Sequence, residues 1–374
     1  MASIYHLLDE REPFSDRDGG GISRWVANVL REGTEIVICS SFDSTWGFPA
    51  NRIYQLPHWD FKGPIHPVVY RQRLPWSLQK LVYRKVFQPL LDKLNRGDII
   101  YVHNRPQYAA VLSRMAKPHG IRVVLHMHNS HLIRSNGGQL EALRKTPIIF
   151  CSEFLRSEAN TAVSNHFEST WVVYGGADGA RFYPVERDRK PVPTVVFTGR
   201  LQPYKGVHIL MEAMRILQSN GIEAKCKIAG ASGFGLSRGT RYTRHLEHIR
   251  PENVELVGYK SGDSLADLVR TADIFCCPSI FHDPFPATTL EAMAAGLPIV
   301  ASNVGGLPEA LAYGGGVLVS PNDPKALSSA LGRLVADGSY RKELGQQAQA
   351  SYNDHFQWSS VREQYNQVLQ RIVS

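Results

Sequence analysis

The sequence predicts an α/β protein built from two Rossmann-like, doubly wound domains. Its 374 residues exceed the usual size of one hydrophobic core and suit two domains of roughly 150–200 residues each. Short β-branched runs alternate with amphipathic stretches, which is typical of a parallel sheet covered by helices. A polar, proline-rich segment, Tyr183–Pro193, interrupts this alternation. We therefore expect an N-terminal domain over residues 1–183 and a C-terminal domain over residues 184–355, facing each other across a cleft.

The expected strands are short apolar runs separated by turns and helices. They are SIYHLL, TEIVICSS, DIIYVHN, RVVLHMH, PIIFCS, STWVVY, TVVFTG, AKCKIAG, VELVGY, DIFCCPS, PIVASNV and GVLVSP. Helical patterns fall between them at Ser23–Arg31, Pro106–Lys117, Gly206–Ser219, Leu265–Thr271 and Leu290–Ala295. A final helix within residues 356–374 has one apolar face, and we expect it to pack back on the first domain. That face consists of Trp358, Val361, Tyr365, Val368, Leu369 and Ile372.

Composition excludes several classes of protein. With 43% hydrophobic and 20% charged residues, the chain is globular rather than disordered or coiled coil. No apolar run reaches the ~18 residues of a membrane span. The start, MASIYHLLDEREP, lacks the basic residues and the long apolar region of a signal peptide. Five cysteines without a C-x-x-C motif are typical of core residues in a reducing compartment, so we expect a cytoplasmic protein.

A glycine-rich loop and a basic loop each follow an expected strand. The first, DRDGGGIS (Asp16–Ser23), has three consecutive glycines that would let a ligand approach the start of the next helix. A turn that needs positive φ explains the same glycines equally well. In TVVFTGRLQPYKG, Arg200 follows a strand and Lys205 precedes a helix, so the two cations could bind a diphosphate. A pair of solvated surface cations is the alternative.

The segment SIFHDPFPATTLEAMAAGLP, Ser279–Pro298, places two carboxylates eight residues apart. Asp283 lies in a proline-rich loop, and Glu291 lies near the first turn of a helix that Thr288 or Thr289 would cap. Both carboxylates could face the cleft and accept hydrogen bonds from sugar hydroxyls. Glu291 could equally be an acid that stabilises the helix dipole, and the spacing alone does not choose between these roles.

Histidines gather at the ends of two strands in the first domain. HMHNSH places His126 and His128 on the same side of a strand and His131 just beyond it. YVHNRP adds three polar residues to the same rim: His103, Asn104 and Arg105. Such spacing could hold zinc, but no cysteine or carboxylate cluster accompanies it, so we expect no metal. An active-site histidine is the preferred interpretation, with core or loop histidines as the alternative.

Taken in order, these motifs resemble the retaining glycosyltransferases of family 4, which have the two-domain GT-B fold. The order is DGGGISR, HMHN, CSEFLR, GGADGARFYP, GRLQPYKG, the D-x7-E block, LEAMAAGLPIVAS, GGLPE and FQW, and it covers nearly the whole chain. KIAGASGFGLSRGTRYTRHLEHI, with HNRP and HMHN, is similar to the bacterial branch that builds surface polysaccharide, such as lipopolysaccharide, or spore-coat glycans. Asp283 stands where the family usually has Glu, and Pro286 stands where Gly is common.

The resemblance implies a role for individual residues. The implied catalytic residues are His128, Asp283, Arg200 and Lys205. Arg200 and Lys205 correspond to the pair that binds the donor diphosphate, and Glu291 corresponds to the carboxylate that holds the ribose. The implied donor-binding set is Gly20, Gly21, Arg200, Lys205, Asp283, Phe285, Pro286, Ala287, Thr288 and Glu291. The implied acceptor-binding set is His103, Asn104, Arg105, His126 and Asn129.

The implied reaction transfers a hexose from a nucleoside diphosphate sugar to a glycan or lipid-linked acceptor, with retention of configuration. A UDP sugar is favoured over a GDP sugar, and no cofactor or metal is expected, because cations at the departing diphosphate would stabilise its charge. Two other classes stay open: a nucleotide-sugar epimerase or hydrolase of the same shape, and a non-catalytic sugar-binding coat protein. A nicotinamide dehydrogenase is disfavoured, because no G-x-G-x-x-G follows the first strand.

Most of the formal charge of +8 lies in one segment, Phe61–Arg96, which holds eight Lys or Arg and one acid, Asp92. Aromatic and aliphatic residues between these cations suit a helix that lies in the headgroup region of an anionic membrane. We therefore expect contact with the inner face of the cell membrane. A helix with an apolar core side and solvated charges is the alternative, and nucleic acid is not an expected partner.

Overall fold

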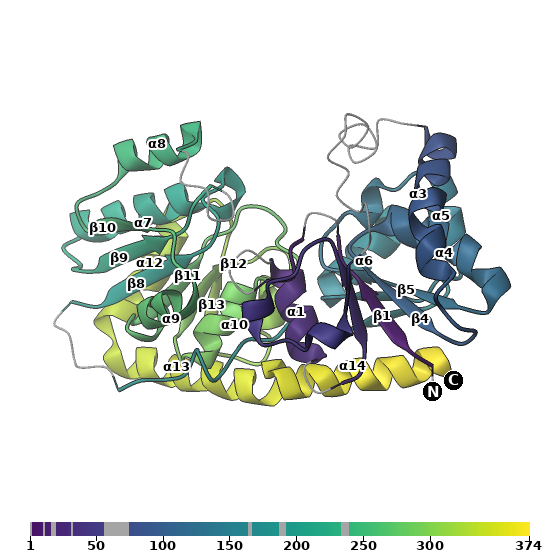
Figure 1. The fold of residues 1–374 in the computed structure, drawn as a ribbon. Helices are drawn as coiled ribbons and strands as arrows, with labels where there is room; N and C mark the ends of the chain where they lie inside the picture. Colours follow the sequence, from purple (N-terminus) through teal and green to yellow (C-terminus); the bar gives the residue numbers. More distant parts are fainter. Residues whose placement is uncertain are drawn as a thin grey trace. The chain divides into compact units, whose positions relative to one another are not determined.

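The computed structural model describes residues 2–9, 12–15, 20–30, 33–55, 75–163, 167–186, 192–232 and 239–374. The chain divides into two compact units (Figure 1). The first unit is Met1–Tyr174 with Arg362–Ser374, and the second unit is Gly175–Val361. The boundary expected after residue 183 falls inside the second unit by this division, and the roles expected for the two domains stay predictions.

The described part of the first unit contains one parallel sheet with the strand order β3-β2-β1-β4-β5-β6-β7. Its strands are β1 (Ile4–Leu7), β2 (Ile36–Cys39), β3 (Ile53–Gln55), β4 (Ile99–His103), β5 (Arg122–Met127), β6 (Ile148–Phe150) and β7 (Thr170–Val172). The register pairs His6 of β1 with Tyr101 of β4, and His103 of β4 with His126 of β5. Three neighbouring strands thus bring histidines from distant parts of the chain together.

The helices of the first unit have recognisable start signals. They are α1 (Gly21–Val29), α3 (Trp76–Leu91), α4 (Pro106–Ala116), α5 (Gly137–Leu143), α6 (Glu153–Ala162) and, from Arg362 onward, α14 (Trp358–Val373). Proline occupies the first position of α4, and the Ser152 side chain caps α6. In α14, Tyr365, Val368 and Ile372 are buried at helical spacing, so this helix contributes to the core of the first unit.

The described part of the second unit also contains one parallel sheet, with the order β10-β9-β8-β11-β12-β13. Its strands are β8 (Thr194–Thr198), β9 (Lys225–Ala229), β10 (Val254–Gly258), β11 (Ile274–Cys277), β12 (Ile299–Ser302) and β13 (Gly316–Val319). Its helices are α7 (Val207–Ser219), α8 (Arg241–Ile249), α9 (Gly262–Arg270), α10 (Ala287–Ala294), α11 (Leu307–Ala310), α12 (Pro324–Ala336) and α13 (Gly338–Ser351).

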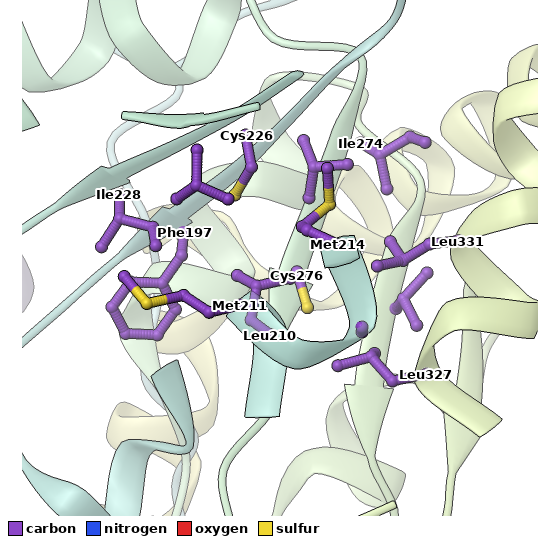
Figure 2. Close-up of a cluster of buried hydrophobic side chains, with 14 of the residues drawn as sticks. Phe197, Leu210, Met211, Met214, Cys226, Ile228, Ile274, Cys276, Leu327 and Leu331 are labelled. Atoms are coloured by element: carbon purple, nitrogen blue, oxygen red, sulfur yellow. The ribbon is translucent and has the colours of Figure 1, made fainter. Parts of the chain in front are cut away.

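A buried cluster fixes the sheet of the second unit against α7 and α12. Figure 2 shows side chains from both helices packed on β8, β9 and β11. The labelled members are Phe197, Leu210, Met211, Met214, Cys226, Ile228, Ile274, Cys276, Leu327 and Leu331. Burial raises the pKa of both cysteine thiols in this cluster, so they behave as apolar core groups. The core holds the ends of β8 and β11 in fixed positions.

The expected strands and helices agree with the structure. Every strand-like run named above contains a strand, and every expected helix overlaps a helix. The short strand β3 was not expected. The cap expected at Thr288 or Thr289 is wrong, because α10 begins at Ala287 with Pro286 at its N-cap position. Among the described residues, none of the helices has the length and apolar character needed to cross a membrane.

Candidate active site

Strand order locates the candidate site within each unit. In the first unit β1 lies between β2 and β4, and in the second unit β8 lies between β9 and β11. The order therefore reverses beside β1 and beside β8. Doubly wound sheets bind ligands beyond the carboxyl ends of their strands at such reversals. The residues after β1, β4, β8 and β11 are thus the candidates that the fold itself indicates.

In the second unit, Arg200 and Lys205 lie beyond the carboxyl end of β8. Arg200 is exposed, and its guanidinium carbon lies 5.9 Å from the ring centroid of Tyr204. Lys205 ends a 3₁₀ turn, and Gly206 follows with φ 71°. A side chain at Gly206 would collide with the carbonyl oxygen of Pro278, just after β11. Glycine at this position therefore lets the turn that carries Lys205 approach β11.

Lys205 forms an ion pair with Asp283, and both side chains are mostly buried. Burial is the largest single influence on the pKa of Lys205 and lowers it. The attraction to Asp283, Cys277 and Tyr204 and the hydrogen bond to Asp283 together outweigh burial and raise the pKa overall. Lys205 therefore stays protonated at neutral pH. The structure joins two residues that the sequence predicted separately, a phosphate-binding cation and a sugar-facing carboxylate.

The two glycines of VGGLPE support the loop that carries Asp283. Gly305 has φ 61°, and a side chain there would collide with the backbone of Asp283. A side chain at Gly306 would collide with the carbonyl oxygen of Pro284. The backbone amide of Gly306 donates to the carbonyl oxygen of Asp283 at 2.8 Å. The turn at Gly305 and Gly306 therefore packs directly against the backbone of the loop that carries Asp283.

Glu291 lies in the second turn of α10 and is only 6% exposed. It is therefore a buried acid, and its roles as a ribose ligand and as an acid that stabilises the helix dipole both stay predictions. Pro286 is buried, Ala287 is exposed, and Phe285 and Thr288 are half-buried. The phenyl ring of Phe285 lies 5.7 Å from that of Phe356. All of the donor-binding residues expected in the C-terminal half thus follow β8 or β11.

In the first unit, four imidazoles gather at the carboxyl ends of β1, β4 and β5. His6, His103 and His126 are fully buried on these strands, and His128 follows β5 and is half-buried. Nδ1 of His6 lies 3.0 Å from Nε2 of His103, and Nδ1 of His103 lies 3.1 Å from Nε2 of His128. Desolvation lowers the pKa of His6 and of His128 to about 3, so both rings are neutral near pH 7.

Asn104 and Asn129 fix the loop that carries His128. Asn104 has φ 61°, which is uncommon for a residue with a side chain, and its Oδ1 accepts from the amides of His128 and Asn129 at 3.0 and 3.1 Å. Oδ1 of Asn129 accepts from the amide of His131 at 3.0 Å. Both asparagines were expected to bind an acceptor, and the structure shows their amide oxygens engaged in holding the loop.

Two carboxylates near β1 engage residues that were also expected to bind ligands. Arg105 is buried and forms an ion pair with Asp9. Oε1 of Glu12 accepts from the amides of Gly20 and Ser23 at 2.8 and 3.2 Å, at the start of α1. A Cβ at Gly20 would lie 2.6 Å from this oxygen, so glycine lets the carboxylate approach. Gly21 begins α1, and Asp16–Gly19 lie outside the described residues.

His103, His126 and His128 could also be considered as metal ligands. One ring nitrogen from each lies within 4.8 Å of the others. No Asp, Glu or Cys joins this group among the described residues, and His103 uses both ring nitrogens in contacts with other imidazoles. Three histidines can hold a catalytic zinc ion, but His103 would have to give up a contact with another imidazole to bind one. The expectation of no metal stays a prediction.

Sequence patterns did not indicate four of these residues. His6 is a single polar residue in an apolar strand, and its partner His103 is 97 positions away. Tyr365, whose hydroxyl lies 3.2 Å from Nε2 of His6, was expected only as part of an apolar helix face. Asp9 and Glu12 stand in the polar start of the chain. No local sequence pattern predicts these contacts, because each of them joins residues that come close together only in the folded structure.

Part of the chain matches a known protein family. Residues 183–351 match the family described as "Glycosyl transferases group 1". This stretch includes Arg200, Lys205, Asp283 and Glu291, and it spans less than half of the chain. The match lies within the second unit.

Across most of its length the chain is similar to particular proteins. It is 26% identical to spore coat protein SA of Bacillus subtilis over 302 residues, which cover 75% of this chain and 80% of that protein. Its fold is similar to sucrose-phosphate synthase of Thermosynechococcus elongatus, with a TM-score of 0.79 and 19% identity over 99% of both chains.

It is also similar to Anabaena HepE in complex with UDP-glucose, with a TM-score of 0.71 and 18% identity over 98% of this chain and 99% of that one. At these identities the two structural likenesses establish the fold alone. They confirm the predicted class of two Rossmann-like α/β domains, that of the GT-B glycosyltransferases.

Proposed function

We propose that the protein is a retaining glycosyltransferase of family 4, in the bacterial branch that builds surface polysaccharide or spore-coat glycans. It transfers a hexose from a nucleoside diphosphate sugar to a glycan or lipid-linked acceptor. One observation carries the proposal: Arg200 and Lys205 follow β8, and Lys205 contacts Asp283 after β11, at the strand-order reversal of a group 1 glycosyltransferase domain.

The two cations act on the leaving group. Cleavage of the anomeric bond leaves negative charge on the diphosphate, and an ammonium and a guanidinium fixed beside it stabilise that charge. Lys205 is suited to this role because it is mostly buried and stays protonated. The carboxylate of Asp283 holds Lys205 until the diphosphate replaces it, and then faces the donor sugar. The acceptor hydroxyl attacks the anomeric carbon from the side of the leaving diphosphate, its proton passes to the departing phosphate oxygen, and no metal takes part.

The remaining donor contacts follow from burial and position. Glu291 accepts hydrogen bonds from the ribose hydroxyls, which suits a buried carboxylate. The backbone from Phe285 to Thr288 lines the sugar, and Gly20 and Gly21 meet the diphosphate. A UDP sugar is the favoured donor, and the similarity in fold to HepE, whose structure holds UDP-glucose, supports that choice.

The first unit binds the acceptor through His103, Asn104, Arg105, His126 and Asn129, and His128 lies near the reacting sugar. Because Asn104, Arg105 and Asn129 use side-chain atoms to hold this region, they shape the site as well.

We place the protein in the cytoplasm, at the inner face of the cell membrane. On α3, Leu78 and Leu81 are 47% and 57% exposed beside Arg84 and Lys85, which suits contact with anionic lipid. In contrast, Tyr83, Phe87 and Leu90 of the same helix are buried, so these three of the aromatic and aliphatic residues between the cations do not face lipid. Residues 61–74, with Arg71 and Arg73, lie outside the described residues.

Thermal shift with UDP and GDP sugars identifies the donor, because a ligand that binds the native state raises the melting temperature. Sugar transfer to lipid-linked and free glycan acceptors is then measured. Lys205→Ala should lower turnover by on the order of 10²-fold or more. Lys225→Ala is the matched control, because Lys225 is exposed at the amino end of β9, away from the carboxyl ends of the strands.

Other outcomes would select the competing classes. Donor consumption without any acceptor would favour an epimerase or hydrolase. Tight binding without turnover on any acceptor would favour a non-catalytic sugar-binding protein. Near-normal turnover in a folded Lys205→Ala variant would exclude Lys205 from the reaction.

A further inference from the structure

A continuous row of hydrogen-bonding groups crosses the first unit, and we call it the histidine chain: Tyr365, His6, His103 and His128. The hydroxyl of Tyr365, on α14, lies 3.2 Å from Nε2 of His6. His6 and His103 meet at 3.0 Å, and His103 and His128 meet at 3.1 Å. The chain therefore joins a residue near the C-terminus to the histidine expected beside the reacting sugar.

The imidazoles of this chain are neutral. His6 and His103 are fully buried, and Tyr365 is 1% exposed. Burial, and to a lesser extent Arg52, lowers the pKa of His6, whereas burial and then the neighbouring imidazoles lower the pKa of His103. Burial raises the pKa of Tyr365, so its hydroxyl keeps its proton. Every member of the histidine chain is thus neutral and has one hydrogen atom to donate in a hydrogen bond.

A neutral imidazole carries one N–H and one free acceptor nitrogen. His6 and His103 each use both nitrogens in the chain. If the hydrogen bond at one end points toward His128, every other bond must point the same way. The chain therefore has only two arrangements, and the hydroxyl of Tyr365 selects between them.

Tyr365 is best satisfied when it donates to His6. In the reverse arrangement Tyr365 accepts from His6, and its own buried proton needs another acceptor. The hydroxyl of Tyr101, whose ring centroid lies 5.6 Å from that of Tyr365, can supply that acceptor, because the two hydroxyls interact through a hydrogen bond. The buried proton of Tyr101 then has no acceptor among the described residues, whereas in the forward arrangement Tyr101 donates to Tyr365 and both protons are satisfied. The cost of an unsatisfied buried hydroxyl favours the forward arrangement by on the order of tenfold.

We propose that Tyr365, acting through His6 and His103, holds His128 in the tautomer that is protonated on Nδ1. His128 then presents an N–H donor to an oxygen atom of the ligand, either a sugar hydroxyl or a phosphate oxygen. It stabilises developing negative charge and does not act as a base. Tyr365, His6 and His103 are positioning residues in this scheme, and the link to ligand rests on the proposed function.

Nuclear magnetic resonance of the ligand-free protein tests the chain without any assay of activity. Long-range proton–nitrogen spectra of histidine-labelled protein distinguish a protonated ring nitrogen from a free one, and His128→Gln assigns the signal. We expect a protonated Nδ1 and a free Nε2 on His128. In Tyr365→Phe the hydroxyl that fixes the direction of the hydrogen bonds is lost. A substantial share of His128 should then carry its proton on Nε2.

Tyr101→Phe is the matched control, because Tyr101 stacks on His6 with ring centroids 4.9 Å apart but has no hydrogen bond to a histidine of the histidine chain. Without the hydroxyl of Tyr101, donation to His6 is still the arrangement that satisfies the proton of Tyr365. Tyr101→Phe should therefore leave the tautomer of His128 unchanged. His103→Asn interrupts the chain at its centre and should release His128 as Tyr365→Phe does, which gives a second route if one variant folds poorly. A free Nδ1 in the wild type, or no change in folded Tyr365→Phe and His103→Asn, would overturn the proposal.

Kinetics then separate this proposal from the proposed function. Tyr365→Phe should lower kcat for transfer several-fold while the affinity for the free nucleoside diphosphate stays unchanged, and Tyr101→Phe should change neither. If no transfer is found with any donor, the proposed function fails, but the spectra still decide whether the histidine chain fixes the tautomer of His128. If transfer occurs and the spectra show no control, only the histidine chain is refuted.

Discussion

Mild acid should destabilise the first unit, because its core holds neutral histidines. The pKa of His6 and of His128 is lowered to about 3, mainly by burial, and burial also lowers the pKa of His103 and His126 well below the ordinary 6.5. The unfolded chain binds protons near pH 6.5, whereas the folded unit does not. Stability is therefore complete above the unfolded pKa and is lost as the pH falls from there toward about 3.

The size of the effect follows from the number of these histidines. Each proton bound only by the unfolded state costs about 1.4 kcal/mol per pH unit. Between about pH 7.5 and about pH 5.5, four such histidines should together lower the free energy of unfolding by roughly 5 kcal/mol. A typical domain is stable by only about 5–15 kcal/mol, so the first unit should become marginal near pH 5.5.

Urea unfolding followed by tryptophan fluorescence at several pH values measures this loss. Trp25 is 2% exposed, with its ring 4.6 Å from that of His126, and Trp25→Phe identifies its signal. His126→Leu should reduce the loss between about pH 7.5 and about pH 5.5 by about 1.4 kcal/mol, the share of one histidine. His119→Gln, at an exposed position, is the control that should not change it. A loss below about 1.4 kcal/mol in the wild type, the effect of a single histidine, would refute the reasoning.

Three further results are expected. Glu291→Gln should weaken nucleoside diphosphate binding by about 1–3 kcal/mol in calorimetry, and unchanged affinity would leave Glu291 as a structural acid. Transfer activity should survive chelator treatment, and a loss that added divalent ions restore would contradict the metal-free reaction. The protein should sediment with anionic vesicles at low salt and be released at high salt. The triple variant Leu81→Ser, Arg84→Gln, Lys85→Gln should bind vesicles more weakly, by about 1 kcal/mol for each lost cation; equal recovery of wild type in the supernatant with and without vesicles would exclude this membrane contact.

Local patterns were enough to predict the architecture. Buried parallel strands need consecutive apolar residues, and these runs are visible between glycine and proline turns. The strand β3 was missed because its three residues, Ile53–Gln55, are too few to establish a period. The start of α10 was misplaced because threonine is a common cap, whereas here Pro286 takes the N-cap position.

The candidate site was only partly predictable, for a physical reason. Lys205 and Asp283 belong to motifs with local signals, but their ion pair depends on the close approach that Gly206 allows. The contact between His6 and Tyr365 joins residues 359 positions apart. Such contacts arise from the register of strands and the packing of a terminal helix, which no local pattern encodes.

Carboxylates of the chain itself occupy two places where an anionic ligand is expected. Asp283 pairs with Lys205 in the second unit, and Glu12 accepts from the amides of Gly20 and Ser23 in the first. A diphosphate that binds at either place must displace the carboxylate already there. This displacement lowers the affinity for small anions, because the protein gives up an internal interaction of the same kind as the one it forms with the anion. A complete nucleotide sugar that binds Glu291 as proposed makes contacts beyond the two displaced carboxylates, so internal pairing favours it over inorganic phosphate.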